Sequence, residues 1–571
     1  MSVTIEKYDA VVVGAGLAGN AAAMELEQRG HHVVVLTKLH PLRSHSGAAQ
    51  GGINAALSEE DSIDLHMFDT IKGSDYLADQ DAVELMCSKA PETIRWAERM
   101  GAAFSRNEKG EIAQRPFGGQ SKPRACFAKD RTGITLLQTT FEQAHRAGVD
   151  FLDEWYVSDL IYKNGKVTGV VAFNIRNHEE RKIFQAKSVL FATGGYARAF
   201  KINSNAHANT GDGLSIVARK GLPLEDMEFV QFHPSGLAGT GILISEAARG
   251  EGGLLFNSEG ERFMKNYAPE KMELAPRDVV SRAITKEIHE GRGVGPRKDA
   301  VYLDMTHLGK EKIMSRLPEL RDLAHTFLGM DMIDEPILIS DTAHYSMGGI
   351  PTNIRGQVRQ DHNGNLVEGF YAAGECACVS VHGANRLGAN SVLEALFFGK
   401  HVGTEMANDL DDLEFGEVSE NDIKQTESEI DWIIKNNGDE SVPKLRDELQ
   451  ATMSENAGVF RTEKSLKEQL EVIENLQKRF KNIRIEDKSR LFNTELQEAI
   501  ELGHMLEYSQ FIVEGALYRE ESRGGHFRED FPARNDEMFL NHTMAYMKDG
   551  KIEIEKMPVK LGRFEVKERT Y

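Results

Sequence analysis

The start of the chain carries a hydrophobic pattern that predicts a β-α-β unit. A continuous apolar run at Tyr8–Val13 predicts a buried strand, the stretch Asn20–Arg29 predicts a helix, and Val33–Leu36 predicts a second strand. The glycine-rich turn GAGLAG, residues 14–19, joins the first strand to the helix. Such glycines permit a tight turn and let a pyrophosphate approach the helix N-terminus. The pattern therefore predicts a dinucleotide-binding unit.

Later segments repeat the strand pattern at wide intervals, which indicates that this nucleotide-binding fold is discontinuous. A strand that ends in Ala-Thr-Gly-Gly well after the first glycine-rich turn is typical of the second nucleotide-contacting turn of many flavoproteins. The segments are a β-structure at 151–171 with a turn at Asn164-Gly165, a strand at 188–192 that ends in Thr-Gly-Gly and is followed by Thr-Gly-Asp-Gly at 210–213, a strand at 369–375, and the run NRLGANS at 385–391 before a helix. Residues 61–106 are expected to be mostly helical, ending near Gly101.

The pattern changes in the middle and in the last third of the chain. Between about Met227 and His344 regular elements are expected to be fewer, which indicates an inserted domain. From about residue 409 the chain is acidic and helical, either as a support domain or as a docking surface for another subunit. Thr494 with Gln497 predicts a capping box that opens a helix, and the tail is expected to be irregular or β. Leu466, Leu470, Ile473, Leu476 and Phe480 recur at helical spacing.

Composition narrows the classes of function. The net charge of −21 argues against a nucleic-acid partner. No stretch approaches the roughly 20 apolar residues of a membrane span, and the start MSVTIEKYDA lacks the features of a signal peptide. We therefore expect a soluble protein of a reducing cytoplasm. The four cysteines, Cys87, Cys126, Cys376 and Cys378, provide neither a disulfide framework nor the spacing of an iron–sulfur or zinc site, so we expect no bound metal.

The run RSHSGAAQGG, Arg43 to Gly52, indicates the cofactor. The second strand ends in Thr37-Lys38, where an NAD site would place an acid for the ribose, so FAD or NADP remains. No Asp or Glu occurs from Gln28 to Ser58, as expected where an anionic reduced ring must be held. Small residues around His45, ending in the pair Gly51-Gly52, suit a backbone that lies flat against a planar ring. Our hypothesis is that a flavin lies here and that His45 is joined to it.

Four basic residues in glycine- or proline-rich contexts indicate an anion site. Arginine binds carboxylates through two parallel hydrogen bonds and histidine adds a donor, so the set predicts a pocket for a small dianion. Glu246 and Arg249 lie three residues apart, and with Arg277 they form either a proton relay or a structural salt-bridge cluster. The four residues are His233, Arg277, His344 and Arg386.

Over nearly its whole length the chain resembles the flavoprotein subunits of succinate dehydrogenase and fumarate reductase. The matching motifs are GAGLAG, TK followed by RSHSGAAQGG, RPFGGQ, DRTG, ATGG, TGDG, QFHPSG, RGEGG, RDVVSR, HYSMGG, HGANRLGANS and ESRGGHFREDFP. The resemblance implies an α/β fold with a Rossmann-like FAD-binding domain at 1–227 and 345–408. A mobile α+β capping domain at 228–344 would interrupt it, and a helical domain at 409–530 and a small C-terminal segment at 531–571 would follow.

The resemblance also implies roles for individual residues. His45 would carry covalent FAD through the 8α carbon, and Arg277 would move the substrate proton, fed by Glu246 and Arg249. Ser245 stands where the family usually has threonine; it keeps the hydroxyl and loses a methyl, so we expect slightly looser packing. The dicarboxylate would be bound by His233, Ser245, His344 and Arg386 beside Phe117. The further cofactor contacts would be Gly14, Ala15, Gly16, Gly19, Lys38, Ser44, Gly51, Gly52, Asp212, Glu375, Ser391 and Val392.

The implied activity is the interconversion of succinate and fumarate by hydride transfer to or from FAD. Electrons would pass to an iron–sulfur subunit and quinone, and membrane anchor subunits would hold the chain peripherally at the cytoplasmic face of the inner membrane. Three alternatives stay open: a soluble L-aspartate oxidase-like enzyme, a stand-alone fumarate reductase, and a non-catalytic FAD-binding scaffold. The first group lacks the tethering histidine, and the haem motif CxxCH of the second is absent from the sequence.

Overall fold

The computed structural model describes residues 4–570. The predicted FAD-binding domain begins at residue 1 and the predicted C-terminal segment ends at residue 571, so residues 1–3 and 571 of these predictions lie outside the described residues. The helices are α1 Leu17–Gln28, α2 Ile63–Gly73, α3 Gln80–Met100, α4 Thr132–Ala147, α5 Asp212–Arg219, α6 Ala247–Gly250, α7 Met264–Tyr267, α8 Arg277–Glu287, α9 Lys310–Arg316, α10 Pro318–Leu328, α11 Asn390–Leu410, α12 Lys424–Lys435, α13 Val442–Asn456, α14 Glu463–Phe480, α15 Thr494–Tyr518 and α16 Asp536–Phe539. The strands are β1 Thr4–Val13, β2 Val33–Thr37, β3 Ile53–Asn54, β4 Gln114–Arg115, β5 Ala125–Cys126, β6 Asp150–Asp153, β7 Trp155–Lys163, β8 Lys166–Asn174, β9 Asn177–Phe191, β10 Leu224–Glu225, β11 Val230–Leu237, β12 Leu254–Phe256, β13 Val301–Asp304, β14 Ile337–Ser346, β15 Ile350–Pro351, β16 Gln357–Arg359, β17 Leu366–Ala372, β18 Ala377–Cys378, β19 Glu440–Ser441, β20 Ile483–Arg484, β21 Asn541–Lys548 and β22 Lys551–Pro558.

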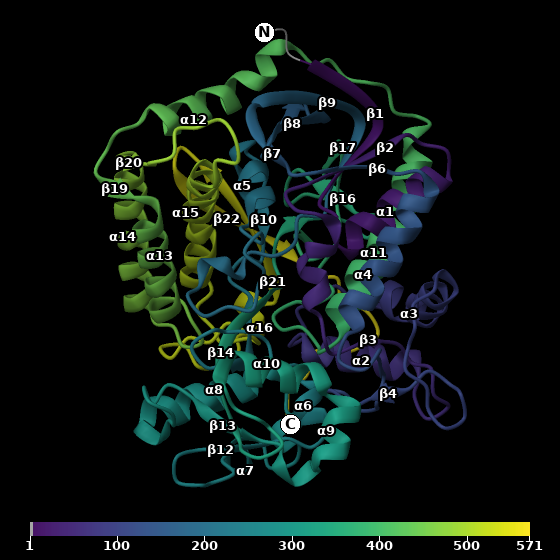
Figure 1. Cartoon of the computed structure of the whole chain (residues 1–571), viewed down its shortest axis with the longest axis vertical. Coiled ribbons are helices and arrows are strands. Elements are labelled where there is room, and N and C mark those ends of the chain that lie inside the picture. The colour runs from purple at the N-terminus through teal and green to yellow at the C-terminus, as the bar shows by residue number, and fades with distance from the viewer. Residues whose placement is uncertain (1–3, 571) are drawn as a thin grey trace.

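An eight-stranded sheet organises the upper part of the molecule (Figure 1). Its order is β16-β17-β8-β9-β1-β2-β6, and β7 pairs with β8. β1 is parallel to both neighbours, with Val12 opposite Val35 on one side and Leu190 on the other. All three residues are fully buried, as expected for a parallel strand covered on both faces. β17 also pairs in parallel with β9, so late residues complete a sheet that early residues begin.

Helix α11 packs directly on α1 because glycines let the two backbones approach closely. A Cβ at Gly399 would lie 2.5 Å from the carbonyl oxygen of Ala18, and one at Gly403 would lie 2.7 Å from that of Ala22. The contacts advance in the same direction along both helices. The N-termini of α1 and α11 therefore lie at the same end of the sheet.

The predicted elements of the sheet are confirmed, with one difference in length. β1, α1 and β2 form the predicted β-α-β unit, and β7 and β8 form a hairpin. Its turn has φ 53° at Asn164 and φ 80° at Gly165, the left-handed conformation that such hairpin turns require. β9 begins at Asn177, well before the predicted residue 188, because its polar first half pairs with β8 while partly exposed.

The stretch between the two parts of the sheet contains more regular structure than its sequence indicated. It forms an antiparallel sheet of order β11-β14-β13-β12 with α6 to α10 around it, at the lower end of Figure 1. Helices α8 and α10 have 11 residues each. These elements are short and separated by glycine and proline, so little periodicity is visible in sequence. β14 runs on to Ser346, and the domain limits stay predictions.

Helices α13, α14 and α15 pack side by side at the left of Figure 1. The predicted apolar stripe of α14 is confirmed, since Leu466 and Leu476 are fully buried. The predicted capping box of α15 is wrong. Asn493 caps this helix by accepting the N–H of Leu496 at 2.8 Å, and Gln497 instead donates to Glu501. Among residues 4–570 no helix is long and apolar enough to cross a membrane.

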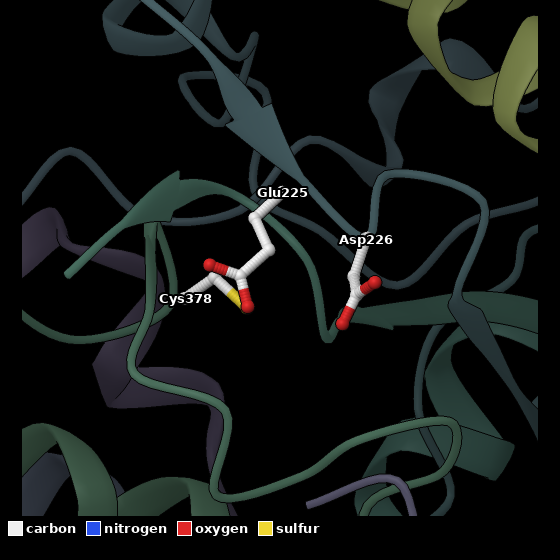
Figure 2. A group of neighbouring side chains, drawn as sticks. All are labelled: Glu225, Asp226 and Cys378. Atoms are coloured by element: carbon white, nitrogen blue, oxygen red, sulfur yellow. The ribbon is translucent and has the colours of Figure 1, made fainter. Parts of the chain in front are cut away.

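A C-terminal hairpin, β21 and β22, pairs with β10 and is anchored by His542. The Nδ1 atom of this buried side chain lies 2.7 Å from Asp226, and Nε2 lies 3.2 Å from Asp79. Figure 2 shows Asp226 with Glu225 and Cys378, whose oxygen and sulfur atoms lie within 4.8 Å of one another. His542 of the hairpin lies 2.7 Å from Asp226 and 3.5 Å from Glu225 of this cluster. That the chain binds no metal stays a prediction.

Candidate active site

The turn from β1 into α1 is closed by backbone packing that only glycine permits. Gly14 has φ 107°, and a Cβ there would lie 2.2 Å from the carbonyl oxygen of Ala192. A Cβ at Gly19 would lie 1.9 Å from the carbonyl oxygen of Gly14. The N–H of Leu17 donates to the Ser46 hydroxyl at 3.2 Å. The turn thus sits directly against the segment that contains His45.

His45 begins a short 3₁₀ turn, His45–Ala48, and one of its ring nitrogens is already used. The N–H of Ala206 donates to Nδ1 at 3.3 Å. Burial lowers the pKa of His45 to about 4, so the imidazole is neutral near pH 7. An acceptor at Nδ1 leaves Nε2 as the nitrogen available for a covalent bond.

Gly51 and Gly52 lie at the cavity wall with no room for a side chain. A Cβ on Gly51 would lie 2.7 Å from the ring of Phe117, and one on Gly52 would lie 2.8 Å from the carbonyl oxygen of Cys126. Arg115 Nε donates to the carbonyl oxygen of Gly51 at 3.0 Å. The backbone therefore faces the cavity directly, as the small-residue pattern predicted.

The contacts of Lys38 show that the predicted absence of carboxylates near this region is wrong. Its Nζ donates to Asp212 at 2.7 Å and to Glu501 of α15 at 2.9 Å. Burial alone would lower the pKa of Lys38, but the two carboxylates raise it above its ordinary value. The stretch contains no acidic residue of its own, but Asp212 and Glu501, which come from other segments, contact it in the folded chain.

Glu375 and the N-terminus of α11 form another part of the cavity wall. Burial raises the pKa of Glu375 to about 8, although it accepts the N–H of Ser346 at 3.1 Å. Ser391 and Val392 lie in the first turn of α11, whose backbone N–H groups have no partner within the helix. These donors suit an anionic or carbonyl oxygen of a bound ligand.

One cavity brings nearly all the predicted residues together. The polar atoms Thr193 Oγ1 and Asn209 Nδ2 belong to residues of its wall and have no hydrogen-bond partner among residues 4–570. With the glycine turn and the α11 N-terminus, these unsatisfied groups fit FAD. Of the predicted residues, Gly14, Ala15, Gly16, Lys38, Ser44, His45, Gly51, Gly52, Phe117, Asp212, His233, Ser245, Glu246, Arg277, His344, Glu375, Arg386, Ser391 and Val392 line it. Gly19 and Arg249 lie behind this wall.

Two histidines meet at one end of the cavity, with ring centroids 5.1 Å apart. His233 Nδ1 accepts the N–H of Ser235 at 3.2 Å, and its buried Nε2 has no partner among residues 4–570. His344 Nδ1 lies 2.7 Å from the Ser204 hydroxyl. Burial and nearby arginines hold both pKa values well below the ordinary value. His233 is therefore neutral, with its proton on Nε2 as a free donor.

Arg277 is held by two acceptors at the start of α8. Its Nε donates to Glu246 Oε2 at 2.7 Å, and its Nη1 donates to Gln231 Oε1 at 3.1 Å. Glu246 also lies 3.8 Å from Arg249 Nη2 and accepts the N–H of Gly118. Burial tends to raise the pKa of Glu246, but the two arginines lower it below its ordinary value. The Nη2 group of Arg277 is left for a ligand.

The sequence analysis missed several residues around these groups. Gln231 lies on β11 two residues before His233, a spacing that puts both on one face of a strand. It donates to the carbonyl oxygen of Arg386 at 2.8 Å, so it connects the two arginines. Strand periodicity in QFHPSG was the available signal. Glu394, Tyr345 and Glu501 carried no such signal, because their partners lie far away in sequence.

Comparison with known families shows what the chain is similar to. The family model described as FAD binding domain matches residues 9–392. The model described as fumarate reductase flavoprotein C-term matches residues 446–571.

Individual relatives match over almost the whole chain. The succinate dehydrogenase flavoprotein subunit of Rickettsia bellii is 46% identical, covering 97% of this chain and 96% of the relative. The mitochondrial succinate dehydrogenase [ubiquinone] flavoprotein subunit of Oryza sativa is 45% identical, covering 98% and 91%. Among solved structures, an E. coli quinol fumarate reductase superposes with a TM-score of 0.94 at 37% identity, covering 100% of this chain and 99% of the other.

Proposed function

This chain belongs to the family of succinate dehydrogenase and fumarate reductase flavoprotein subunits, and from that membership we propose that its cavity interconverts succinate and fumarate. The family consists of FAD-dependent oxidoreductases. The observation that carries the proposal is that buried His233, Arg277 and Arg386, with half-buried His344, line the wall of the same cavity as the glycine turn. A small dianion held there lies beside the FAD site.

FAD, when bound, supplies hydride transfer. The residues that would hold it are those of the glycine turn, the 43–52 segment, Asp212, Glu375 and the first turn of α11. His45 would be bonded to the 8α carbon through Nε2, because an imidazole substituted there keeps the Nδ1 lone pair that accepts the N–H of Ala206. A neutral imidazole is also the nucleophilic form.

Substrate carboxylates would be bound by Arg386, by the Nε2–H of His233, by His344 and by the Ser245 hydroxyl. All four side chains line the cavity. Neutral histidines donate without adding repulsion between cations, so the positive charge is concentrated on the arginines. Phe117 covers the same end and excludes water.

Arg277 would give or take the proton at a central carbon through its free Nη2 group. Arginine is ordinarily too basic for this work. The carboxylate of Glu246, 2.7 Å from Arg277 Nε, would exchange protons with Arg277 after each transfer. Arg249, 3.8 Å from Glu246, would be the next group of the relay. Closure of the capping stretch, residues 228–344, over the substrate would exclude water from this transfer.

We further propose that electrons leave to an iron–sulfur subunit and quinone. This subunit and membrane anchor subunits would hold the chain peripherally at the cytoplasmic face of the inner membrane. The similarity to a quinol fumarate reductase and to a mitochondrial relative supports a multi-subunit setting.

The decisive experiment is anaerobic addition of succinate to the purified FAD-loaded chain while the flavin absorption is recorded. Bleaching that fumarate reverses is expected. A flavin that succinate leaves oxidised and L-aspartate bleaches would contradict the proposal in favour of an aspartate oxidase-like enzyme, and a flavin that neither bleaches would indicate a scaffold.

A further inference from the structure

We infer that Glu394, acting through the ring of Tyr345, is a positioning residue for Arg386 and sets how tightly the site holds a dicarboxylate. The inference rests on the proposed function, in which Arg386 binds a substrate carboxylate. Neither Glu394 nor Tyr345 belongs to the predicted site.

Arg386 is buried, and no carboxylate of the described residues 4–570 forms an ion pair with it. It is 2% exposed, and its Nε has no hydrogen-bond partner among residues 4–570. Its guanidinium carbon instead lies 4.4 Å from the ring centroid of Tyr345. Burial lowers the pKa of Arg386 to about 9, and Arg277 acts in the same direction. The cation therefore needs support that does not occupy its donors.

Tyr345 is backed by a buried carboxylate. Its hydroxyl donates a short hydrogen bond to Glu394 Oε2, which also lies 3.1 Å from His382 Nε2. Glu394 lies on α11 and is 2% exposed. A phenol that donates to a carboxylate has a more electron-rich ring, and the face of such a ring attracts a cation more strongly. The charge of Glu394 thus acts on Arg386 through the ring.

The indirect arrangement has a chemical advantage over a direct ion pair. A carboxylate paired with Arg386 would occupy the N–H edge that a substrate carboxylate needs for two parallel hydrogen bonds. The Tyr345 ring covers the face of the guanidinium and leaves this edge to the ligand. Glu394 therefore stabilises the cation without competing with the substrate.

Other charged groups also face Arg386 and have to be considered. Arg277 on α8 lowers its pKa, whereas Tyr345, Glu375 and Glu246 raise it. His233 on β11 and His344 on β14 are near enough to interact with it, and both are held neutral by burial. Glu394 raises the pKa values of both Glu375 and Tyr345, so its replacement by an amide acts on Arg386 through these two neighbours. Tyr345→Phe keeps the carboxylate and removes only the hydroxyl that contacts it.

The test compares Glu394→Gln and Tyr345→Phe with the unsubstituted FAD-loaded chain. Malonate, a dicarboxylate without two central carbons, reports binding through the flavin absorption, and succinate turnover is measured in parallel. We expect the Kd of malonate and the KM of succinate to rise about 5- to 30-fold, with kcat changed less than about threefold.

The control is Glu405→Gln, which removes another carboxylate of α11, one that pairs with Arg355 outside the cavity. It should leave the malonate Kd unchanged. An unchanged malonate Kd in Glu394→Gln, or a fall in kcat as large as the rise in KM, overturns the inference, because a merely structural role would not weaken binding selectively. If Glu394→Gln does not fold, Tyr345→Phe keeps the ring and decides by the same criteria. An unsubstituted chain that neither binds malonate nor oxidises succinate contradicts the proposed function instead.

Discussion

Arg277 Nε and Glu246 Oε2 lie 2.7 Å apart, and both side chains are buried in the wall of the cavity. Glu246 is also within 3.8 Å of Arg249, so one carboxylate lies between two guanidinium groups. This relationship orients the Arg277 guanidinium so that Nη2 is left for a ligand. In the proposed mechanism, Glu246 is the group that returns a proton after each turnover.

Replacing Arg277 by glutamine is expected to abolish proton transfer and keep binding. We expect kcat for succinate oxidation to fall by at least about 10³-fold, while the malonate Kd changes less than about fivefold. Steady-state kinetics and flavin absorption measure the two quantities. Arg297→Gln removes the same charge from an exposed Arg–Asp pair and should leave both unchanged. Substantial residual turnover in Arg277→Gln would remove it as the proton carrier.

His45→Ser is expected to convert tethered FAD into dissociable FAD. The unsubstituted chain should keep its yellow colour after acid precipitation, and the variant should release it. His32→Ser changes an exposed histidine at the start of β2 and serves as the control. Flavin that washes off the unsubstituted chain would show that the covalent assignment is wrong.

Lys38→Met is expected to weaken both folding and FAD retention. The substitution leaves Asp212 and Glu501 buried without their shared cation, which typically costs about 3–5 kcal/mol. The unfolding midpoint and the FAD content of the purified chain measure the effect. Lys89→Met, at an exposed pair with Glu92, should change neither. A stable, FAD-replete Lys38→Met variant would contradict the inferred role of this network.

Glu225 should make stability depend on pH. Burial raises its pKa from about 4.5 to about 8; His542 opposes this shift, and Asp226 and Asp79 add to it. Because the folded chain holds this proton more tightly than the unfolded chain, the stabilising contribution is complete below about pH 4.5 and is lost as the pH rises toward 8. The unfolding midpoint of the unsubstituted chain should therefore fall more between these pH values than that of Glu225→Gln.

The matched control for this pH effect is Glu368→Gln, an exposed glutamate whose removal should leave the pH dependence as it is. Parallel pH profiles for the unsubstituted chain and Glu225→Gln would mean that Glu225 is ionised in the folded protein.

The N-cap of α15 can be tested by two neighbouring alanine substitutions. Asn493→Ala removes the side chain that accepts the N–H of Leu496 and should cost about 1 kcal/mol of unfolding free energy. Thr494→Ala changes an exposed residue inside the helix, where alanine is the better helix former, so it should raise the unfolding free energy by a few tenths of a kcal/mol. Urea unfolding measures both. The reverse ranking would restore the capping box predicted from sequence.

The elements that could be predicted from the sequence are those whose structure is determined by residues close together in the chain. The β1-α1-β2 unit, the Asn164-Gly165 turn and the stripe of α14 each follow from spacing or turn chemistry within a few residues. Lys38 was recognised as unusual, yet its partner Glu501 lies 463 residues away, and no local pattern connects them. The capping box failed for a smaller reason, since Asn493 caps as well as Thr494 would.

For the candidate site too, only residues in recognisable local motifs could be predicted from the sequence. His233, Arg277, His344 and Arg386 stood out by their local motifs, and the cavity contains all four. Tyr345 and Glu394 did not, because an ordinary tyrosine in a strand and an ordinary glutamate in a helix become informative only when α11 brings them together. Their burial is a property of tertiary packing.

The close packing of α1 on α11 has a consequence for the order of events during synthesis. A nascent chain emerges N-terminus first, so the glycine turn is made long before Gly399 and Gly403 can cover α1. Until then α1 can pack on α4 but its α11-facing side is uncovered, and the part of the cavity wall that α11 supplies does not exist. Loading of the flavin is therefore a late step, and a ribosome-bound fragment that stops before residue 390 should remain colourless.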